Sequence, residues 1–188
     1  MWEKKLRQNL GPLPSDWPRL TEKDIASVLV LLYPTEESKG FEILLTKRTS
    51  KVLTHKGQIS FPGGFPEKED NHLLETALRE TKEEIGLSPE AIEVLGILEP
   101  VTTGLQIKII PFLGLVSHRQ KFVLSAEEVE KVFFLPGSEL LAKGLKPVVA
   151  NELHYRVQSI GIKWEEELIW GATAKILEQI YSILMKDL

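Results

Sequence analysis

Cysteine is absent from this sequence of 188 residues. Its absence excludes disulfide bonds, thiolate nucleophiles and zinc sites built from cysteine ligands. Any metal chemistry must therefore rely on oxygen or imidazole ligands. The 27 acidic residues and the four histidines are the candidates.

Long apolar runs are also missing. No stretch of about 18 consecutive apolar residues, the length that a membrane-spanning helix needs, occurs in the chain. The first residues, MWEKKLRQNLGPLPSDWPRL, contain basic side chains without the apolar run of a secretory signal, and the final MKDL differs from the S-K-L type of peroxisomal address. We therefore expect a soluble, cytoplasmic protein that has no membrane partner.

Neither sign of charge dominates the sequence. The 23 basic and 27 acidic residues leave a formal net charge of -4, which gives no overall attraction to a polyanion. We expect no nucleic-acid partner, and a phosphate-bearing ligand must be held by local cations. The length and the hydrophobic fraction of 43% suit one globular domain over residues 1–188. Residues 1–24 are expected to be an N-terminal extension, either packed on the domain or partly mobile.

Hydrophobic patterning predicts an α/β protein. Aliphatic runs predict a pair of strands at 25–33 and 41–48, and the pattern at 152–162 is also typical of a strand. Two further apolar stretches lie at 91–100 and 107–117. Helices are predicted at 71–86, 125–134 and 170–187, the last from four apolar residues at helical spacing. Segment 49–70 is rich in Gly, Pro and polar residues, so we expect an irregular functional segment with a short strand at 58–61. Segment 135–147 is predicted to be a loop.

The helix at 71–86 has clear signals at both ends. Asp70 or Asn71 is the expected N-cap, and Gly86 is a suitable C-terminal stop. Successive residues turn by about 100°, so one apolar stripe is predicted from Leu74, Leu78 and Ile85.

Three glutamates form the opposite face of this helix. Glu80, Glu83 and Glu84 lie within one turn, where like charges repel one another. Such a run is either a solvated surface or a site in which a divalent cation offsets the repulsion. Arg79 lies four residues before Glu83 and is spaced to pair with its carboxylate. Upstream, Gly63 and Gly64 allow the backbone to turn tightly or to approach a ligand closely.

These residues resemble a known motif. Gly64 and the block RETKEEIGL, residues 79–87, are similar to the Nudix box of hydrolases that act on nucleoside diphosphates linked to another moiety. The C-terminal half of the motif matches fully. In the N-terminal half, fourteen residues separate Gly64 from Arg79, one more than usual, and Asp70 or Asn71 stands where the family has glutamate. The difference concerns the loop before the helix.

A second segment narrows the resemblance. Residues 44–64, LLTKRTSKVLTHKGQISFPGG, resemble the segment that precedes the box in the coenzyme A pyrophosphatase branch. The box of this chain, which is one residue longer than usual, is also similar to the box of that branch. The resemblance extends over about residues 25–177. Leu53 departs from it, because a basic residue is expected there. Either other cations of the segment hold the coenzyme A phosphates, or the specificity differs; these cations are Arg48, Lys51, His55 and Lys56.

The resemblance implies a Nudix fold, which is an α/β/α sandwich with a mixed sheet. It also implies hydrolysis of a small-molecule diphosphate with Mg²⁺ or Mn²⁺. With coenzyme A as the substrate, the products are 4′-phosphopantetheine and adenosine 3′,5′-bisphosphate.

The motif assigns roles to individual residues. Glu80 and Glu84, one helical turn apart, are the expected principal metal ligands, with Glu83 as a further ligand that Arg79 orients. The general base is either Glu80 or Glu128, which lies beside Glu127 in a later segment. Substrate phosphates are expected to meet Arg48, Lys51 and His55 and the backbone of Gly63 and Gly64.

Two alternatives stay open. The first keeps the chemistry but changes the substrate to a nucleoside triphosphate, a dinucleotide or a nucleotide sugar, and Leu53 favours it. The second is a non-catalytic module that binds a nucleotide or a protein. Non-catalytic modules have usually lost the box glutamates, whereas all three are present here.

Overall fold

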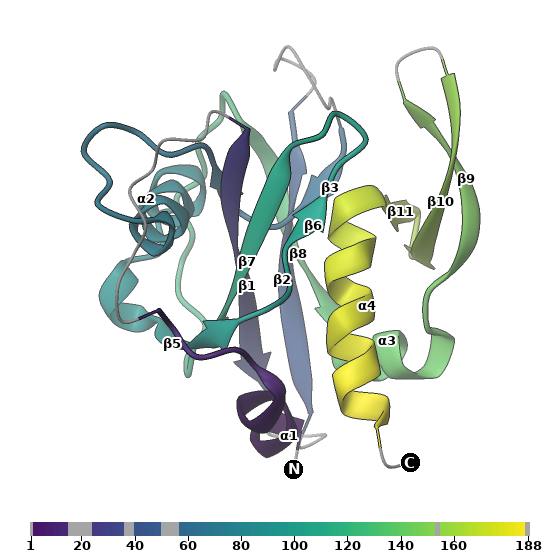
Figure 1. Cartoon of the computed structure of the whole chain (residues 1–188), viewed down its shortest axis with the longest axis horizontal. Helices are drawn as coiled ribbons and strands as arrows, with labels where there is room; N and C mark the ends of the chain where they lie inside the picture. The colour runs from purple at the N-terminus through teal and green to yellow at the C-terminus, as the bar shows by residue number, and fades with distance from the viewer. Residues whose placement is uncertain (1, 15–23, 36–39, 50–56, 153–154, 187–188) are drawn as a thin grey trace.

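The computed structural model describes residues 2–14, 24–35, 40–49, 57–152 and 155–186 (Figure 1). The helices are α1 (Trp2–Asn9), α2 (Leu73–Ile85), α3 (Gly137–Lys143) and α4 (Gly171–Met185), with a short 3-10 turn at Pro89–Ala91. The strands are β1 (Ile25–Pro34), β2 (Phe41–Arg48), β3 (Ile59–Ser60), β4 (Gly63–Gly64), β5 (Glu93–Ile97), β6 (Val101–Thr102), β7 (Lys108–Leu115), β8 (Val129–Pro136), β9 (Lys146–Glu152), β10 (Tyr155–Trp164) and β11 (Glu167–Trp170).

A mixed sheet forms the centre of the molecule. Its main path runs β3-β2-β1-β7-β5, while β8 pairs with β2, β4 with β1 and β6 with β7. Strands β1 and β7 are parallel over eight residue pairs, and the other pairings are antiparallel. The predicted neighbours β1 and β2 are indeed an antiparallel pair, and β3 confirms the short strand that was expected at 58–61.

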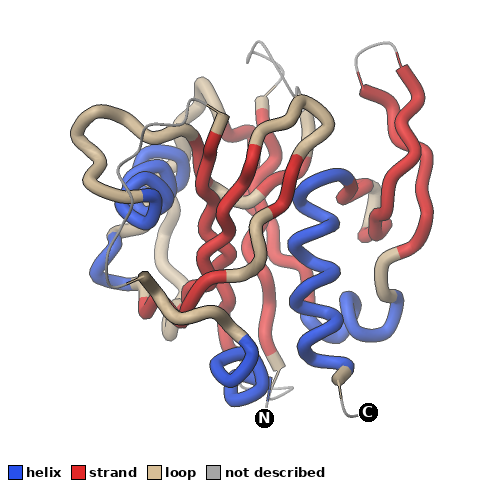
Figure 2. Tube along the Cα trace, in the orientation of Figure 1, coloured by secondary structure: helices blue, strands red, loops and turns tan. Residues whose placement is uncertain are grey.

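Two apolar cores cover the two faces of this sheet. Along β1 the side chains alternate, so that Leu29 and Leu31 face the core beneath α2, whereas Val30 and Leu32 face the core beneath α4. All four are fully buried. Figure 2 shows the helices on both sides of the strands, which confirms the predicted α/β/α sandwich.

Helix α4 provides the largest apolar face of the second layer. Ile176, Ile180, Ile183 and Leu184 are buried, as their spacing predicts. Helix α1 packs beside it through Leu6, and Lys5 Nζ donates to the carbonyl of Leu184 at 3.1 Å. A cation at this end satisfies carbonyls that have no partner within α4.

A smaller antiparallel sheet, β11-β10-β9, stands beside α4. It is joined to the main sheet by side chains. Lys47 of β2 and Lys131 of β8 both contact Glu167 of β11 at 2.9 Å, and the rings of Phe133 and Trp164 stack with centroids 5.6 Å apart. This sheet therefore forms a fixed second wall next to the end of β2.

Among the described residues, no helix combines the length and the hydropathy that a bilayer crossing requires.

Two predicted elements are wrong. The segment 125–134, predicted to be a helix, contains a turn followed by strand β8, because Val132, Phe133 and Phe134 pair with β2. The segment 135–147, predicted to be a loop, contains helix α3, whose Leu140 is fully buried. In both places long-range packing overrides the local pattern.

Candidate active site

Helix α2 presents the carboxylates because its other face is anchored. Leu73, Ala77 and Ile85 are buried, and Gly86 ends the helix in a left-handed conformation with φ of 73°. Leu74 and Leu78 of the predicted stripe are only partly buried.

The N-cap prediction is wrong. His72 occupies that position, and its Nδ1 accepts the N–H of Glu75 at 3.2 Å. Asn71 instead donates its backbone N–H to the Glu75 carboxylate at 2.7 Å.

The three box glutamates differ sharply in exposure. The side chain of Glu84 is 4% exposed, that of Glu80 is 17% exposed and that of Glu83 is 56% exposed. Of the three glutamates, therefore, only Glu83 faces the solvent. The other two side chains point into a pocket, whose lining includes both of them.

Glu84 is a buried carboxyl group without full compensation. Burial raises the pKa of Glu84 to about 8, Arg48 opposes this rise, and the nearby charges of Glu80 and Glu128 add to it. Its Oε2 atom has no hydrogen-bond partner, while Arg48 Nη1 lies 3.9 Å from Oε1. A buried carboxylate oxygen without a hydrogen-bond partner can serve as a ligand to a cation.

Glu80 is packed against the backbone of Gly64. A Cβ atom at position 64 would lie 2.4 Å from Glu80 Oε1, so only glycine leaves room for this carboxylate. Gly63, with φ of 152°, is equally restricted, since a Cβ there would lie 2.2 Å from the carbonyl oxygen of Ser27. Burial also raises the pKa of Glu80, against the opposing effect of Arg79. Both glycines line the pocket, so a ligand bound there can approach their backbone closely.

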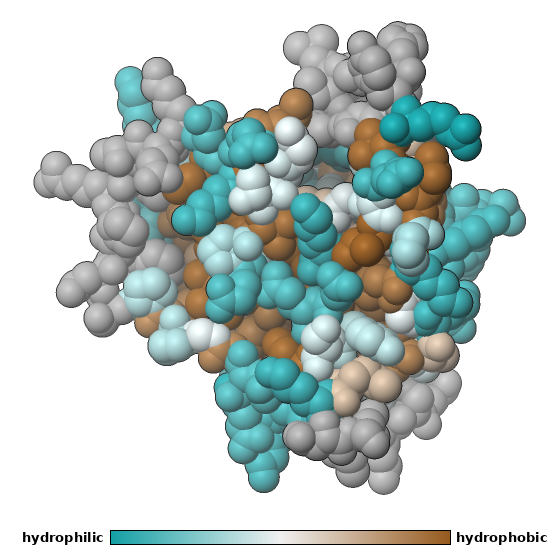
Figure 3. Space-filling model, turned by 45° about the vertical axis from the view of Figure 1, so that its right-hand side comes forward, coloured by the Kyte–Doolittle hydropathy of each residue, from teal (hydrophilic) through white to brown (hydrophobic). Residues whose placement is uncertain are grey.

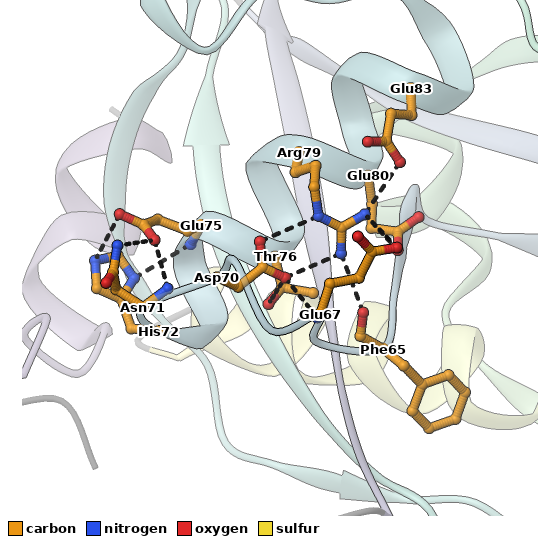
Figure 4. A network of polar contacts seen from close by, with 10 residues as sticks. All are labelled: Phe65, Glu67, Asp70, Asn71, His72, Glu75, Thr76, Arg79, Glu80 and Glu83. Atoms are coloured by element: carbon orange, nitrogen blue, oxygen red, sulfur yellow. Dashed lines mark hydrogen bonds and ion pairs between the residues drawn. The ribbon is translucent and has the colours of Figure 1, made fainter. Parts of the chain in front are cut away.

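Arg79 is the centre of a polar network (Figure 4). Its Nη1 donates to Glu83 at 3.0 Å, as the four-residue spacing predicts, and to Glu80 at 3.1 Å. Its Nη2 donates to the carbonyl of Phe65 at 3.1 Å. One guanidinium thus orients two box carboxylates and fixes the loop before the helix.

Asp70 is the partner of Arg79 that sequence reasoning missed. It binds Nε at 3.1 Å and Nη2 at 3.0 Å, and it also accepts from Thr76 Oγ1 and Glu67 N–H, each at 2.9 Å. Burial would raise the pKa of Asp70, but these hydrogen bonds outweigh it and hold the pKa below its ordinary value. The signal was its position in the box, where the family has glutamate.

The predicted cations are only partly described. Arg48 ends β2, lines the pocket, and its Nε atom is buried without a partner. Lys51, His55 and Lys56, together with Leu53, lie outside the described residues.

Glu128 reaches the same pocket from the turn before β8. Its side chain lines the pocket and its charge acts on both Glu80 and Glu84, whereas Glu127 is exposed. The structure therefore brings Glu80, Glu84, Glu128 and Arg48 together, and leaves Glu83 at the rim beside Arg79.

The donor set suits a hard divalent cation. Carboxylate oxygens are the ligands that Mg²⁺ and Mn²⁺ prefer, and Glu84 offers an unpartnered one. In the part of the chain that is described, no three Asp, Glu or His side chains are grouped so that they could hold a metal ion by themselves. Mg²⁺ usually keeps several waters and binds few carboxylates together with substrate phosphates, so an open set is sufficient.

The pocket is large and two-sided. Its volume is about 1360 Å³, above the roughly 300–1,000 Å³ of ordinary ligand pockets. The carboxylates and Arg48 line one side. The other is lined by apolar residues of β6, β7, β10, the start of α4 and the loop between β6 and β7, including the exposed Leu105 and the partly buried Ile160 and Ala172. Figure 3 brings the α4 side forward and shows apolar patches exposed among hydrophilic side chains.

The Arg79 network gives a stability prediction. Asp70→Asn should lower the free energy of unfolding by about 1–3 kcal/mol, because the partly buried guanidinium loses the carboxylate that accepts two of its hydrogen bonds. Glu67→Gln is the matched control, since its side chain is 61% exposed and lies 3.9 Å from Arg79, and it should change the value by less than about 1 kcal/mol. Urea unfolding measures both. Equal effects of the two substitutions would contradict the assignment.

The burial of Glu84 predicts a pH dependence. Since its folded pKa of about 8 exceeds the ordinary 4.5, its contribution to stability is present in full below 4.5 and is lost as the pH rises through 8. With a chelator present, the melting temperature of the wild type should therefore fall relative to Glu84→Gln between these pH values. A relative change of at least about 2–4 °C corresponds to roughly 1 kcal/mol in a domain of this size. Parallel profiles would show that the pKa of Glu84 is not raised in the folded protein.

Sequence comparison identifies the family to which this site belongs. Residues 23–153 match the family model of the NUDIX domain. The Nudix hydrolase NudL of Pectobacterium atrosepticum is 32% identical over 171 residues, which cover 89% of this chain and 86% of that protein. The mitochondrial Nudix hydrolase 15 of Arabidopsis thaliana is 34% identical over 186 residues, which cover 94% of this chain but 64% of that longer protein.

Solved structures have the same fold. A MutT/nudix family protein from Enterococcus faecalis superposes with a TM-score of 0.53 at 17% identity, covering 99% of this chain and 80% of its own. A C. elegans Ap4A hydrolase gives a TM-score of 0.50 at 19% identity, covering 58% of this chain and 78% of its own. The matching domain and the relative from Pectobacterium atrosepticum show that the chain belongs to the Nudix hydrolases, which act on nucleoside diphosphate derivatives.

Proposed function

We propose that this Nudix hydrolase cleaves the diphosphate of coenzyme A or its derivatives to 4′-phosphopantetheine and adenosine 3′,5′-bisphosphate. The observation that carries the proposal is the segment of residues 44–64, which is similar to the pre-box segment of the coenzyme A pyrophosphatase branch. It runs from β2 through Arg48 to Gly64, and both residues line the pocket. The segment and the box therefore meet at one site.

The proposed cofactor is Mg²⁺ or Mn²⁺, held by Glu80 and Glu84 with Glu83 nearby. The bound cation would neutralise charge on the diphosphate oxygens and make water a better nucleophile. Arg79 keeps Glu80 and Glu83 in place through hydrogen bonds of 3.1 and 3.0 Å.

Two glutamates are candidates for the base that accepts a proton from the attacking water. Glu80 accepts a hydrogen bond from Arg79 at 3.1 Å, and Glu128 lines the pocket from the turn before β8. An ordinary carboxylate is basic enough for a water that is already acidified.

The shape of the pocket supports a substrate that is longer than a mononucleotide. Arg48 has a donor atom without a protein partner and lies beside Glu84, where it can meet a phosphate oxygen. Beyond the carboxylates, the apolar wall around Leu105 and Ile160 offers contact area for an extended arm. Coenzyme A carries such an arm on one side of its diphosphate.

A different substrate is the second candidate. Leu53 stands where a basic residue is expected in the coenzyme A branch, which favours another nucleoside diphosphate derivative such as a nucleoside triphosphate, a dinucleotide or a nucleotide sugar. The similar C. elegans protein is an Ap4A hydrolase, but the likeness extends only to the fold. A non-catalytic nucleotide-binding module is disfavoured because the carboxylates line the pocket.

The first prediction here concerns the substrate. With Mg²⁺ or Mn²⁺, the protein should convert coenzyme A to the two products named above, because the carboxylates and Arg48 meet at the pocket. Chromatography of the products measures this, beside a nucleoside triphosphate, ADP-ribose and a metal-free control. Turnover of another diphosphate with coenzyme A intact would assign Leu53 to a changed specificity. No turnover of any would favour the binding module.

The second prediction concerns the box. Glu83→Gln and Glu84→Gln should each lower kcat by roughly 100-fold or more, since each removes a carboxylate that serves the cation. Glu75→Gln, on the same helix but bound to Asn71 away from the pocket, is the control and should keep the wild-type rate. Circular dichroism should show that all three variants are folded. Wild-type rates in either box variant would contradict the metal assignment.

A further inference from the structure

The turn that carries Glu128 is anchored to the end of helix α2. The backbone N–H of Ser125 donates to the carbonyl of Glu84 at 2.9 Å, and that of Val123 donates to Ile85 at 3.0 Å. These carbonyls belong to the last turn of α2, where they have no partner within the helix. The segment that bears Glu128 is thereby bonded at one end to Glu84, which lines the same pocket.

Thr49 supplies a second anchor from the opposite side. Its backbone N–H donates to the carbonyl of Glu128 at 2.9 Å, and its hydroxyl Oγ1 donates to the carbonyl of Glu127 at 2.8 Å. Thr49 is only 7% exposed. It directly follows β2, at the point where the register between β2 and β8 shifts after Lys47.

The bonds from Thr49 hold the Glu128 carboxylate close to two other carboxylates. Glu80, Glu84 and Glu128 line one pocket, and any two of these carboxylates repel each other when both are ionised. The Glu128 turn lies at the surface, with Ala126 and Glu127 exposed, so it would be the part most able to move away. The bonds from Thr49 oppose that movement.

We propose that Thr49 is a positioning residue, whose hydroxyl holds the Glu127–Glu128 backbone so that the Glu128 carboxylate stays beside Glu80 and Glu84. The inference rests on the proposed function, in which this cluster serves a divalent cation. A negative charge near a cation strengthens its binding whether or not it is a direct ligand. Thr49 therefore acts on the cation through Glu128.

A double-mutant cycle tests this inference with Mn²⁺ alone as the probe. Thr49→Val keeps the side-chain shape and the backbone bond but removes the hydroxyl, whereas Thr49→Ser keeps the hydroxyl. Thr49→Val should weaken Mn²⁺ binding about fivefold, the effect expected of one hydrogen bond, and Thr49→Ser should bind as the wild type. In a Glu128→Gln background, Thr49→Val should cause no further loss. Electron paramagnetic resonance of free Mn²⁺ measures all five proteins.

A purely structural role gives a different result. If Thr49→Val weakens binding equally in both backgrounds, or not at all in the wild type, the inference is overturned. Thermal unfolding of Thr49→Val and Thr49→Ser with a chelator confirms that both variants are folded at the assay temperature. Coenzyme A turnover is measured separately. A non-additive Mn²⁺ cycle without hydrolysis of any diphosphate would overturn the proposed function alone, whereas hydrolysis with an additive cycle would overturn the role of Thr49 alone.

Discussion

The contact of Arg79 with Asp70 is the interaction on which the site depends. The guanidinium is planar and has five donors, so one side chain binds Asp70 with two bonds and still reaches Phe65, Glu80 and Glu83. A lysine offers a single nitrogen and could not make both sets of contacts. By fixing the loop after Gly64 to helix α2, this network keeps the glycine backbone against the Glu80 carboxylate. Box and loop are therefore one rigid unit.

The same arrangement places an ionisable side chain where burial makes its ionisation costly. Glu84 is almost inaccessible to solvent and lies near two further carboxylates, with Arg48 at 3.9 Å as the compensating charge. The two apolar cores on either side of β1 supply the stability that tolerates this cost. A binding site that stays partly uncompensated in the free protein is able to gain free energy when a cation arrives. In the proposed function, this destabilising feature is the one that binds the cation.

The sequence predicts the helix, its carboxylates and Arg79, because periodicity and spacing within one helix are local properties. It does not predict that Glu84 is buried while Glu83 is exposed, since this depends on which strand and turn cover each side chain. The local pattern of β8 predicts a helix for the same reason: its Glu-rich start suits a helix, and only pairing with β2 makes it a strand. Asp70 and Thr49 were missed because their partners lie nine and 78 residues away.

Strand β2 connects these distant parts of the site. It pairs with β3, which leads to the glycines, and with β8, which follows the Glu128 turn. Arg48 and Thr49 lie at its end, so β2 supports both the guanidinium that lines the pocket and the residue that holds the Glu128 turn. A shift of β2 by a single residue against β8 would turn Arg48 to the opposite face and carry Thr49 away from Glu127. The core residues that fix this register, such as Ile43 and Leu45, therefore determine the geometry of the site although they do not touch it.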